Sequence, residues 1–216
     1  MPRIRARKEP ALKVTKEKTA ENRAKLVQAA SRLFRERGID GVGVAEICKA
    51  AGLTHGALYA QFPSKEALAS EAFDEAFARG YNRMKTAGGR RAPALRDHLE
   101  FLVSPQQRDN LAGCPLTASA SEVARKDKAL SASFSSGFEQ LVAVVESVMD
   151  RKVPAAERRD RALTMIAAEI GVIAVARAAA KSRPDLSNRV LAAARRVLTK
   201  LGDAPRGPRR VHRKRR

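Results

Sequence analysis

Residues 39–68, with the sequence IDGVGVAEICKAAGLTHGALYAQFPSKEAL, are the stretch that decides the fold. Within it, two short helices are expected on either side of a tight turn at Gly52-Leu53-Thr54. Small residues before this turn allow the two helices to approach closely, and Thr54 can cap the second helix through its hydroxyl group. This pattern predicts a helix-turn-helix, a motif whose second helix can enter the major groove of DNA.

The charge of the 216-residue chain is +20, and much of it lies at the two ends. Residues 1–25 hold nine Lys/Arg and three acids, and residues 205–216 hold seven Lys/Arg and no acid. The motif-bearing residues 26–80 hold six bases and seven acids. Basic ends attract phosphate groups without sequence preference. We therefore expect a disordered arm at residues 1–18 and a basic tail at 205–216 that assist DNA binding; the alternative is that they serve only solubility.

Several classes of protein are disfavoured by the sequence. The two cysteines, Cys48 and Cys114, lie far apart, which favours a reducing cytosol over a disulfide framework. No secretory signal begins the chain, and Glu169 and Arg177 interrupt its most apolar stretch, so we expect no membrane span. The chain lacks the HExxH, P-loop, GxSxG and dinucleotide fingerprints and has only three histidines. We expect no enzyme, no cofactor and no metal site, and a cytoplasmic, nucleoid-associated location.

The spacing of apolar residues predicts an all-α protein of about nine helices. A polar loop is expected at 104–113 and a flexible link at 86–91. The last two expected helices have wide apolar faces, which favours a symmetric dimer made through both of them; the alternative is a monomeric core. The expected helices cover residues 19–37, 44–51, 55–62, 65–81, 93–102, a segment from Pro115 through Val123, 128–149, 156–181 and 185–201. Gly38 should stop the first of them and Ser64 should cap the fourth. Leu58 and Phe62 should face inward on the third, and Cys48 is expected in the core.

Residues 22–68 resemble the TetR family of bacterial transcriptional regulators. The resemblance rests on Arg37-Gly38-Ile39, on residues 50–54 (AAGLT), on residues 56–59 (GALY) and on residues 62–68 (FPSKEAL). It departs from the family at two positions. Gly43 stands where the family usually has a hydroxyl residue, and Cys48 stands where alanine is common.

The resemblance implies a DNA-binding domain at residues 19–82, with its helix-turn-helix at about 43–62. It implies a second domain at residues 83–204 that binds an unknown small-molecule effector. In the family this domain also forms a homodimer through its last two helices. Effector binding changes the spacing of the two heads, so that they no longer match successive major grooves of a double-stranded operator.

The candidate DNA contacts surround the second helix of the motif, where side chains reach bases and backbone N–H groups reach phosphate. His55 is a candidate base or phosphate contact, and the Ala57 methyl can touch a thymine methyl. The Tyr59 hydroxyl can reach phosphate, and Lys65 places a cation at a helix N-terminus, which a nearby phosphate would explain. The alternatives are a solvated histidine, helix packing at Gly56 and Ala57, and a ring that closes the head. The candidates are Thr54, His55, Gly56, Ala57, Tyr59, Ala60 and Lys65.

The candidate effector pocket lies among the helices that precede the last two. Aromatic and polar residues at helical spacing suggest its walls, although such residues also form ordinary cores. Cys114 lies at an expected helix N-terminus, which lowers a thiol pKa and favours a redox or electrophile sensor; the alternative is a buried pocket cysteine. The candidates are Phe77, Tyr81, His98, Phe101, Cys114, Thr117 and Phe138.

Two functions remain open from the sequence. The first is a dimeric, ligand-responsive repressor that a small molecule releases from its operator. The second is an architectural nucleic-acid-binding protein without sequence preference, driven by its basic ends. A preferred operator site would favour the first, and a steep salt dependence without a preferred site would favour the second.

Overall fold

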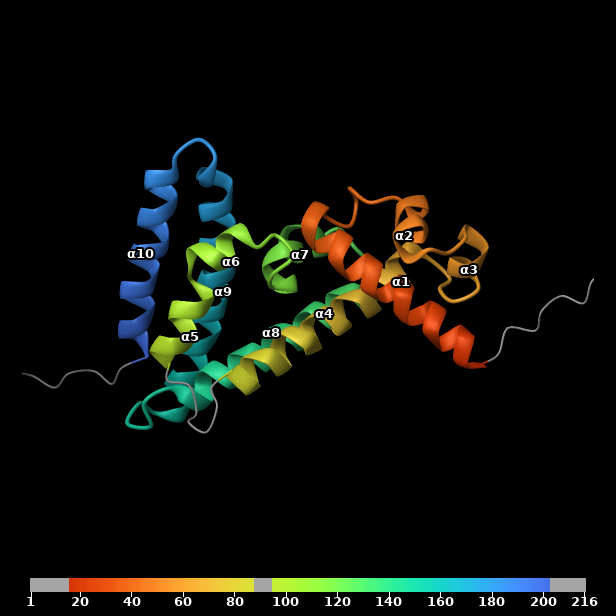
Figure 1. Cartoon of the computed structure of the whole chain (residues 1–216). Helices are drawn as coiled ribbons and strands as arrows, with labels where there is room; N and C mark the ends of the chain where they lie inside the picture. Colours follow the sequence, from red (N-terminus) through yellow and green to blue (C-terminus); the bar gives the residue numbers. More distant parts are fainter. Residues whose placement is uncertain (1–15, 88–94, 203–216) are drawn as a thin grey trace, which may run out of the picture.

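The computed structural model describes residues 16–87 and 95–202, which form ten α-helices (Figure 1). The all-α class is confirmed, and no strand occurs in these two ranges. The expected arm over residues 1–15, most of the link at 86–91 and the tail at 205–216 lie outside them. The helices are α1 (Lys16–Arg37), α2 (Val44–Ala51), α3 (His55–Tyr59), α4 (Lys65–Ala87), α5 (Leu95–Leu102), α6 (Pro105–Asp109), α7 (Pro115–Val123), α8 (Lys128–Val148), α9 (Ala155–Ala180) and α10 (Pro184–Leu201).

Three helix boundaries differ from the expected ones by three or more residues, and one helix is additional. Residues 16–18 belong to α1 and not to the arm, because Glu21 pairs with Lys18 at 2.9 Å and with Lys25 at 2.7 Å along this helix. The stretch 104–113 contains the additional helix α6, which Ser104 caps by accepting from the Gln107 N–H at 3.1 Å. α3 ends at Tyr59 rather than at residue 62, and α4 continues to Ala87 rather than to residue 81.

The head consists of α1 to α3 and the first part of α4, packed around a common core. Leu26, Ile47, Leu58 and Leu68, one from each helix, are fully buried. α1 ends at Gly38, whose φ of 80° suits glycine and whose N–H donates to the Phe34 carbonyl at 2.9 Å. The expected helix stop at this glycine is therefore confirmed.

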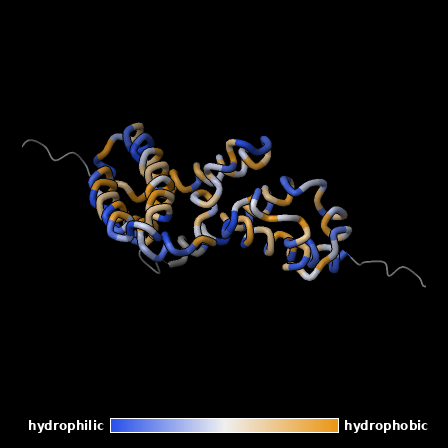
Figure 2. The backbone as a smooth tube through the Cα atoms, turned by 90° about the horizontal axis from the view of Figure 1, so that it is seen from above, coloured by the Kyte–Doolittle hydropathy of each residue, from blue (hydrophilic) through white to orange (hydrophobic). Residues whose placement is uncertain are grey.

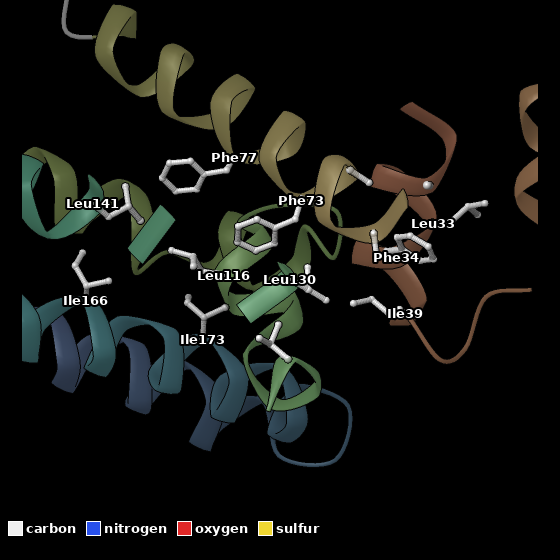
Figure 3. Packing of buried hydrophobic residues seen from close by; sticks show 14 of the residues in the cluster. Leu33, Phe34, Ile39, Phe73, Phe77, Leu116, Leu130, Leu141, Ile166 and Ile173 are labelled. Atoms are coloured by element: carbon white, nitrogen blue, oxygen red, sulfur yellow. The ribbon is translucent and has the colours of Figure 1, made fainter. Parts of the chain in front are cut away.

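The core continues from the head into the body along α4 and α8. These two helices lie side by side, and Phe73 stacks on Phe77 along α4 with ring centroids 6.5 Å apart. Phe73 also contacts Phe134 on α8, with centroids 6.1 Å apart. Figure 3 shows this continuity, from Phe34 and Ile39 in the head past Phe73 and Phe77 to Leu116, Leu130, Ile166 and Ile173 in the body.

The body is built on the antiparallel pair α9 and α10, with α8, α7, α6 and α5 packed against it (Figure 1). Both helices of the pair keep large apolar side chains exposed, namely Val175 on α9 and Leu186 and Val197 on α10. Figure 2 shows hydrophobic and hydrophilic residues alternating along the helices, as expected of amphipathic helices packed around a core. By length and composition alone α9 could also cross a membrane, although its charges were expected to exclude this. Its packing against α6, α7, α8 and α10 assigns it to the body.

Candidate functional site

The turn between α2 and α3 sets the position of the exposed helix α3. Gly52 ends α2 with φ 66°, a conformation that other residues rarely adopt, and the Leu53 N–H donates to the Cys48 carbonyl at 2.9 Å. Thr54 then caps α3, its hydroxyl oxygen accepting from the Ala57 N–H at 3.2 Å. The expected cap is confirmed, and the short α3 therefore has a fixed beginning.

Six of the candidate DNA contacts gather on α3 and its two caps. Thr54, His55, Gly56 and Ala60 are exposed, and the Tyr59 side chain is 56% exposed. Ala57 is half-buried beneath them. Leu58 and Phe62, which were expected to face inward, are fully buried and hold α3 on the head. α3 thus exposes two large side chains, His55 and Tyr59, and small residues between and beside them.

Lys65 lies apart from this group, at the start of α4. Its ammonium nitrogen donates to the Val42 carbonyl at 2.9 Å, directly before α2 begins. Gly43 caps α2 without a side-chain hydrogen bond, as its missing side chain requires. Lys65 therefore ties α4 to the segment that enters α2.

Arg23 was not anticipated, yet it fixes the end of α3. Its guanidinium donates to the Gln61 carbonyl at 2.8 Å and pairs with Glu71 on α4. It also lies over the Phe62 ring, 4.2 Å from the centroid, in a cation–π contact. One side chain from α1 thus joins the segment after α3 to α4. The partners of Arg23 lie 38 and 48 residues away in the sequence, so no local pattern predicts these contacts.

The head meets the body at both ends of α7. At its start, Arg35 on α1 donates to the Ala112 carbonyl and, at 3.0 Å, to the Gly113 carbonyl. Beyond its end, Lys126 pairs with Asp40. This ion pair lowers the pKa of the exposed Asp40 carboxyl through its hydrogen bond to Lys126. Any displacement of α7 must therefore act on the segment that leads into the helix-turn-helix.

The candidate pocket residues do not converge on one cavity. Phe77 and Tyr81, with ring centroids 5.8 Å apart, line a groove of about 500 Å³ between α4 and α8. Phe138 on α8 is half-buried and packs against the core. Phe101 is 58% exposed, because the inward face of α5 carries Leu95, His98, Leu99 and Leu102 instead. Phe101 is therefore a surface residue and does not wall an enclosed pocket.

Two titratable groups, His98 and Glu169, lie in the interior of the body, and a third, Cys114, is partly buried. Burial lowers the pKa of His98 on α5 to about 4, and its Nε2 has no hydrogen-bond partner among the described residues. Burial raises the pKa of Glu169 on α9 to about 8. Burial also raises the pKa of the Cys114 thiol, and the nearby Glu169 adds to this shift. The lowered thiol pKa expected from the helix N-terminus is therefore outweighed.

Within residues 16–87 and 95–202, no group of three or more His, Cys, Asp or Glu side chains could hold a metal ion. Cys48, expected in the core, is 2% exposed there. The features that remain are an exposed helix on a rigid head, a junction at α7, and buried polar groups in the body.

Comparison with known proteins covers both halves of the chain. Residues 26–72 match the sequence profile described as bacterial regulatory proteins of the tetR family. Residues 92–186 match the profile of the C-terminal domain of LmrA/YxaF-like transcriptional regulators. The transcriptional regulator LmrA of Bacillus subtilis is 30% identical over 181 residues, covering 76% of this chain and 90% of that protein. AcrR of Shigella flexneri is 40% identical over 60 residues, and the chain spans only 28% of its length.

Solved structures share the fold at lower identity. A TetR-family regulator from Cytophaga hutchinsonii has a TM-score of 0.68 and 21% identity, covering 89% of this chain and 98% of that one. The reduced form of Escherichia coli NemR has a TM-score of 0.64 and 20% identity, covering 81% and 95%. These likenesses extend over head and body together, so the arrangement of the two halves is that of the solved proteins.

Proposed function

We propose that this chain, which belongs to the TetR family of bacterial regulatory proteins, is a homodimeric repressor that a small molecule releases from its operator. Membership makes it a DNA-binding transcriptional regulator with a helix-turn-helix. Repression, dimerisation and release are the parts that we propose. The observation that carries the proposal is the exposed surface of α3, held by the Thr54 cap and by the buried Leu58 and Phe62.

We assign the DNA contacts to this surface and to Lys65. His55 is exposed in the first turn of α3, where a side chain can reach a base edge, and Gly56 beside it keeps the backbone accessible to DNA. Tyr59 can donate its hydroxyl to a phosphate, and Ala57 and Ala60 provide small apolar contacts. Lys65 uses one donor on Val42, and its two other N–H groups can serve a phosphate at the start of α2.

We place the dimer interface on the exposed apolar face of α9 and α10. Val175, Leu186 and Val197 are large apolar side chains left uncovered there, and Gly171 and Ala178 are small exposed residues that permit close approach. Two copies joined by a two-fold axis would cover this face with the same face of the partner. Such a dimer holds two heads at a fixed spacing, which a palindromic operator requires.

We propose that release runs through α7. An effector in the body that shifts α7 would pull on Arg35 at one end and on Asp40 at the other. Because these contacts flank the segment between α1 and α2, the shift would turn the head and change the distance between the two α3 helices. The regulator would act in the cytoplasm, where nucleoid DNA is accessible.

Footprinting of the purified protein on the DNA upstream of its own gene tests this proposal. A repressor of this kind protects a short, nearly palindromic site, with the same site found by genome-wide binding. Uniform protection without a preferred site, together with a steep loss of binding as salt increases, would instead support the architectural function. An unprotected promoter and no genomic sites would refute specific regulation.

A further inference from the structure

A single carboxyl group interrupts the apolar inward face of α9. Glu169 is 6% exposed, in the same inward stripe as Met165, Ile166 and Ile173, each at most 3% exposed. Its Oε2 atom has no hydrogen-bond partner among residues 16–87 and 95–202. Burying a carboxyl group without a hydrogen-bond partner destabilises the folded chain, and an apolar side chain in its place would avoid that penalty.

Within residues 16–87 and 95–202, no cationic side chain pairs with Glu169. Arg177, further along α9, donates to the carbonyls of Gln107, Arg108 and Asn110, each at 2.9 Å, and so serves the α6 segment. The titratable group near Glu169 at the start of α7 is Cys114; burial first, and then the nearby Glu169, raise the pKa of its thiol, which keeps it uncharged. No ion pair to Glu169 is formed within the described residues. The described part of the chain therefore leaves Oε2 open to a proton or to a donor from outside these residues.

We propose that Glu169 anchors the effector, and that the effector is an amphipathic molecule bearing a protonated amine. This inference rests on the proposed function, because it supplies the ligand class for a ligand-released repressor. The ammonium group would donate to Oε2 and stabilise the ionised carboxylate, a charge-assisted hydrogen bond in a water-poor interior. The apolar side chains above and below Glu169 on α9 would receive the hydrophobic part of the molecule.

The position of Glu169 also connects such a ligand to the head. Cys114, on the other side of the site, is the residue that begins α7, and Gly113 before it holds Arg35 of α1 through its carbonyl at 3.0 Å. A ligand inserted between Glu169 and Cys114 must push the start of α7 away from α9. That displacement acts directly on the contact through which the body holds α1.

The test is a fluorescence titration of the full-length chain without DNA. The probe is dansylcadaverine, a dansyl fluorophore with a primary ammonium group, and its control is the N-acetyl derivative, which has lost the charge. Wild-type protein is expected to bind the ammonium probe about tenfold or more tightly than the acetylated one. Glu169→Gln is expected to abolish this preference and to leave binding of the acetylated probe unchanged.

Two further variants separate recognition from folding. Glu169→Met refills the apolar stripe and should raise the melting temperature while removing the preference. Asp160→Asn, an exposed acid on the same helix, should bind both probes like the wild type. Equal affinity of the wild type for both probes, no saturable binding of the ammonium probe, or a preference retained in Glu169→Gln would each overturn the inference. Operator protection by the ligand-free chain is measured separately, so a failure there counts against the repressor proposal and not against this site.

Discussion

The Glu122 carboxylate on α7 accepts a hydrogen bond from the backbone N–H of Ile39 at 2.8 Å, directly after α1 has ended at Gly38. A residue from the body thus satisfies a backbone donor in the segment that leads to the helix-turn-helix. The ion pair of Lys126 with Asp40 lies beside this contact. Body and head therefore share a polar junction at the C-terminal end of α7.

Replacing Glu122 by Ala should weaken both folding and signal transfer. The Ile39 N–H would lose its acceptor, and an unpaired, partly buried donor costs about 1–3 kcal/mol in the free energy of unfolding. Chemical denaturation measures this loss, with Glu139→Ala on the exposed face of α8 as the control. A free energy of unfolding equal to that of the control would show that the junction does not stabilise the chain.

Replacing Gly38 by alanine should destabilise the chain more than replacing Gly52 by alanine. Gly38 and Gly52 both have positive φ, so alanine at either position should cost about 1–2 kcal/mol in backbone strain. Only at Gly38 would the new Cβ collide with the Glu122 carboxylate; at Gly52 it would meet open space. We expect Gly38→Ala to lower the melting temperature more than Gly52→Ala. The reverse order in thermal denaturation would contradict the packing at this junction.

The Thr54 cap should be separable from the surface that it supports. Thr54→Ala removes the acceptor of the Ala57 N–H and should destabilise the chain by about 0.5–2 kcal/mol, whereas Thr54→Ser should keep most of that stability. Operator affinity should fall in the alanine variant, because α3 loses its fixed beginning. Thermal melting and fluorescence anisotropy with an operator duplex measure the two effects, and equal values for both variants would exclude a capping role.

His98 should make the chain sensitive to mild acid. Its pKa in the folded chain is about 4 because burial disfavours the charged form, whereas the ordinary value is 6.5. The unfolded chain therefore binds a proton more readily, so stability falls as pH decreases from 6.5 towards 4, by up to about 3 kcal/mol. Urea denaturation of the wild type and of His98→Gln across this range should show a shallower pH dependence in the variant. Identical slopes would show that His98 is not buried as a neutral ring.

Glu169 should make the chain less stable as pH rises, which is opposite to the effect of His98. Its pKa in the folded chain is about 8 against an ordinary 4.5, because burial disfavours the carboxylate. The folded chain holds the proton more tightly, so stability is greatest below pH 4.5 and decreases as pH rises towards 8. Glu169→Gln should remove this decrease. Between pH 4.5 and 6.5 the contributions of His98 and Glu169 oppose each other, so the single variants must be compared and not the wild type alone.

The sequence predicted the parts of the fold that depend on neighbouring residues. The stop at Gly38 and the caps at Thr54 and Ser64 are local, because each is made within a few residues of its own helix end. The outward face of α3 followed from the spacing of Leu58 and Phe62, which are buried as expected. The family that residues 22–68 resemble is confirmed by the matching sequence profiles and by LmrA.

The parts that escaped prediction depend on residues far apart in the chain. Arg23 forms a hydrogen bond with Gln61, Arg35 with Gly113, and Glu122 with Ile39. The spacing of apolar residues in the sequence does not predict such contacts. Phe101 was expected in a pocket because it is aromatic, but the register of α5 turns it to solvent. Glu169 was visible as a charge within an apolar stretch, and only the packing of α9 shows that it faces inward.

The measurement that tests the central claim most directly is the operator preference of a chain without its basic ends. A variant lacking residues 1–15 and 205–216 would be titrated by fluorescence anisotropy against the footprinted operator duplex and against a shuffled duplex of the same composition. We predict weaker binding and a shallower salt dependence for this variant, with the preference for the operator retained and then lost on His55→Ala. Loss of the preference on removing the ends alone, or its persistence in the His55→Ala variant, would contradict recognition by α3.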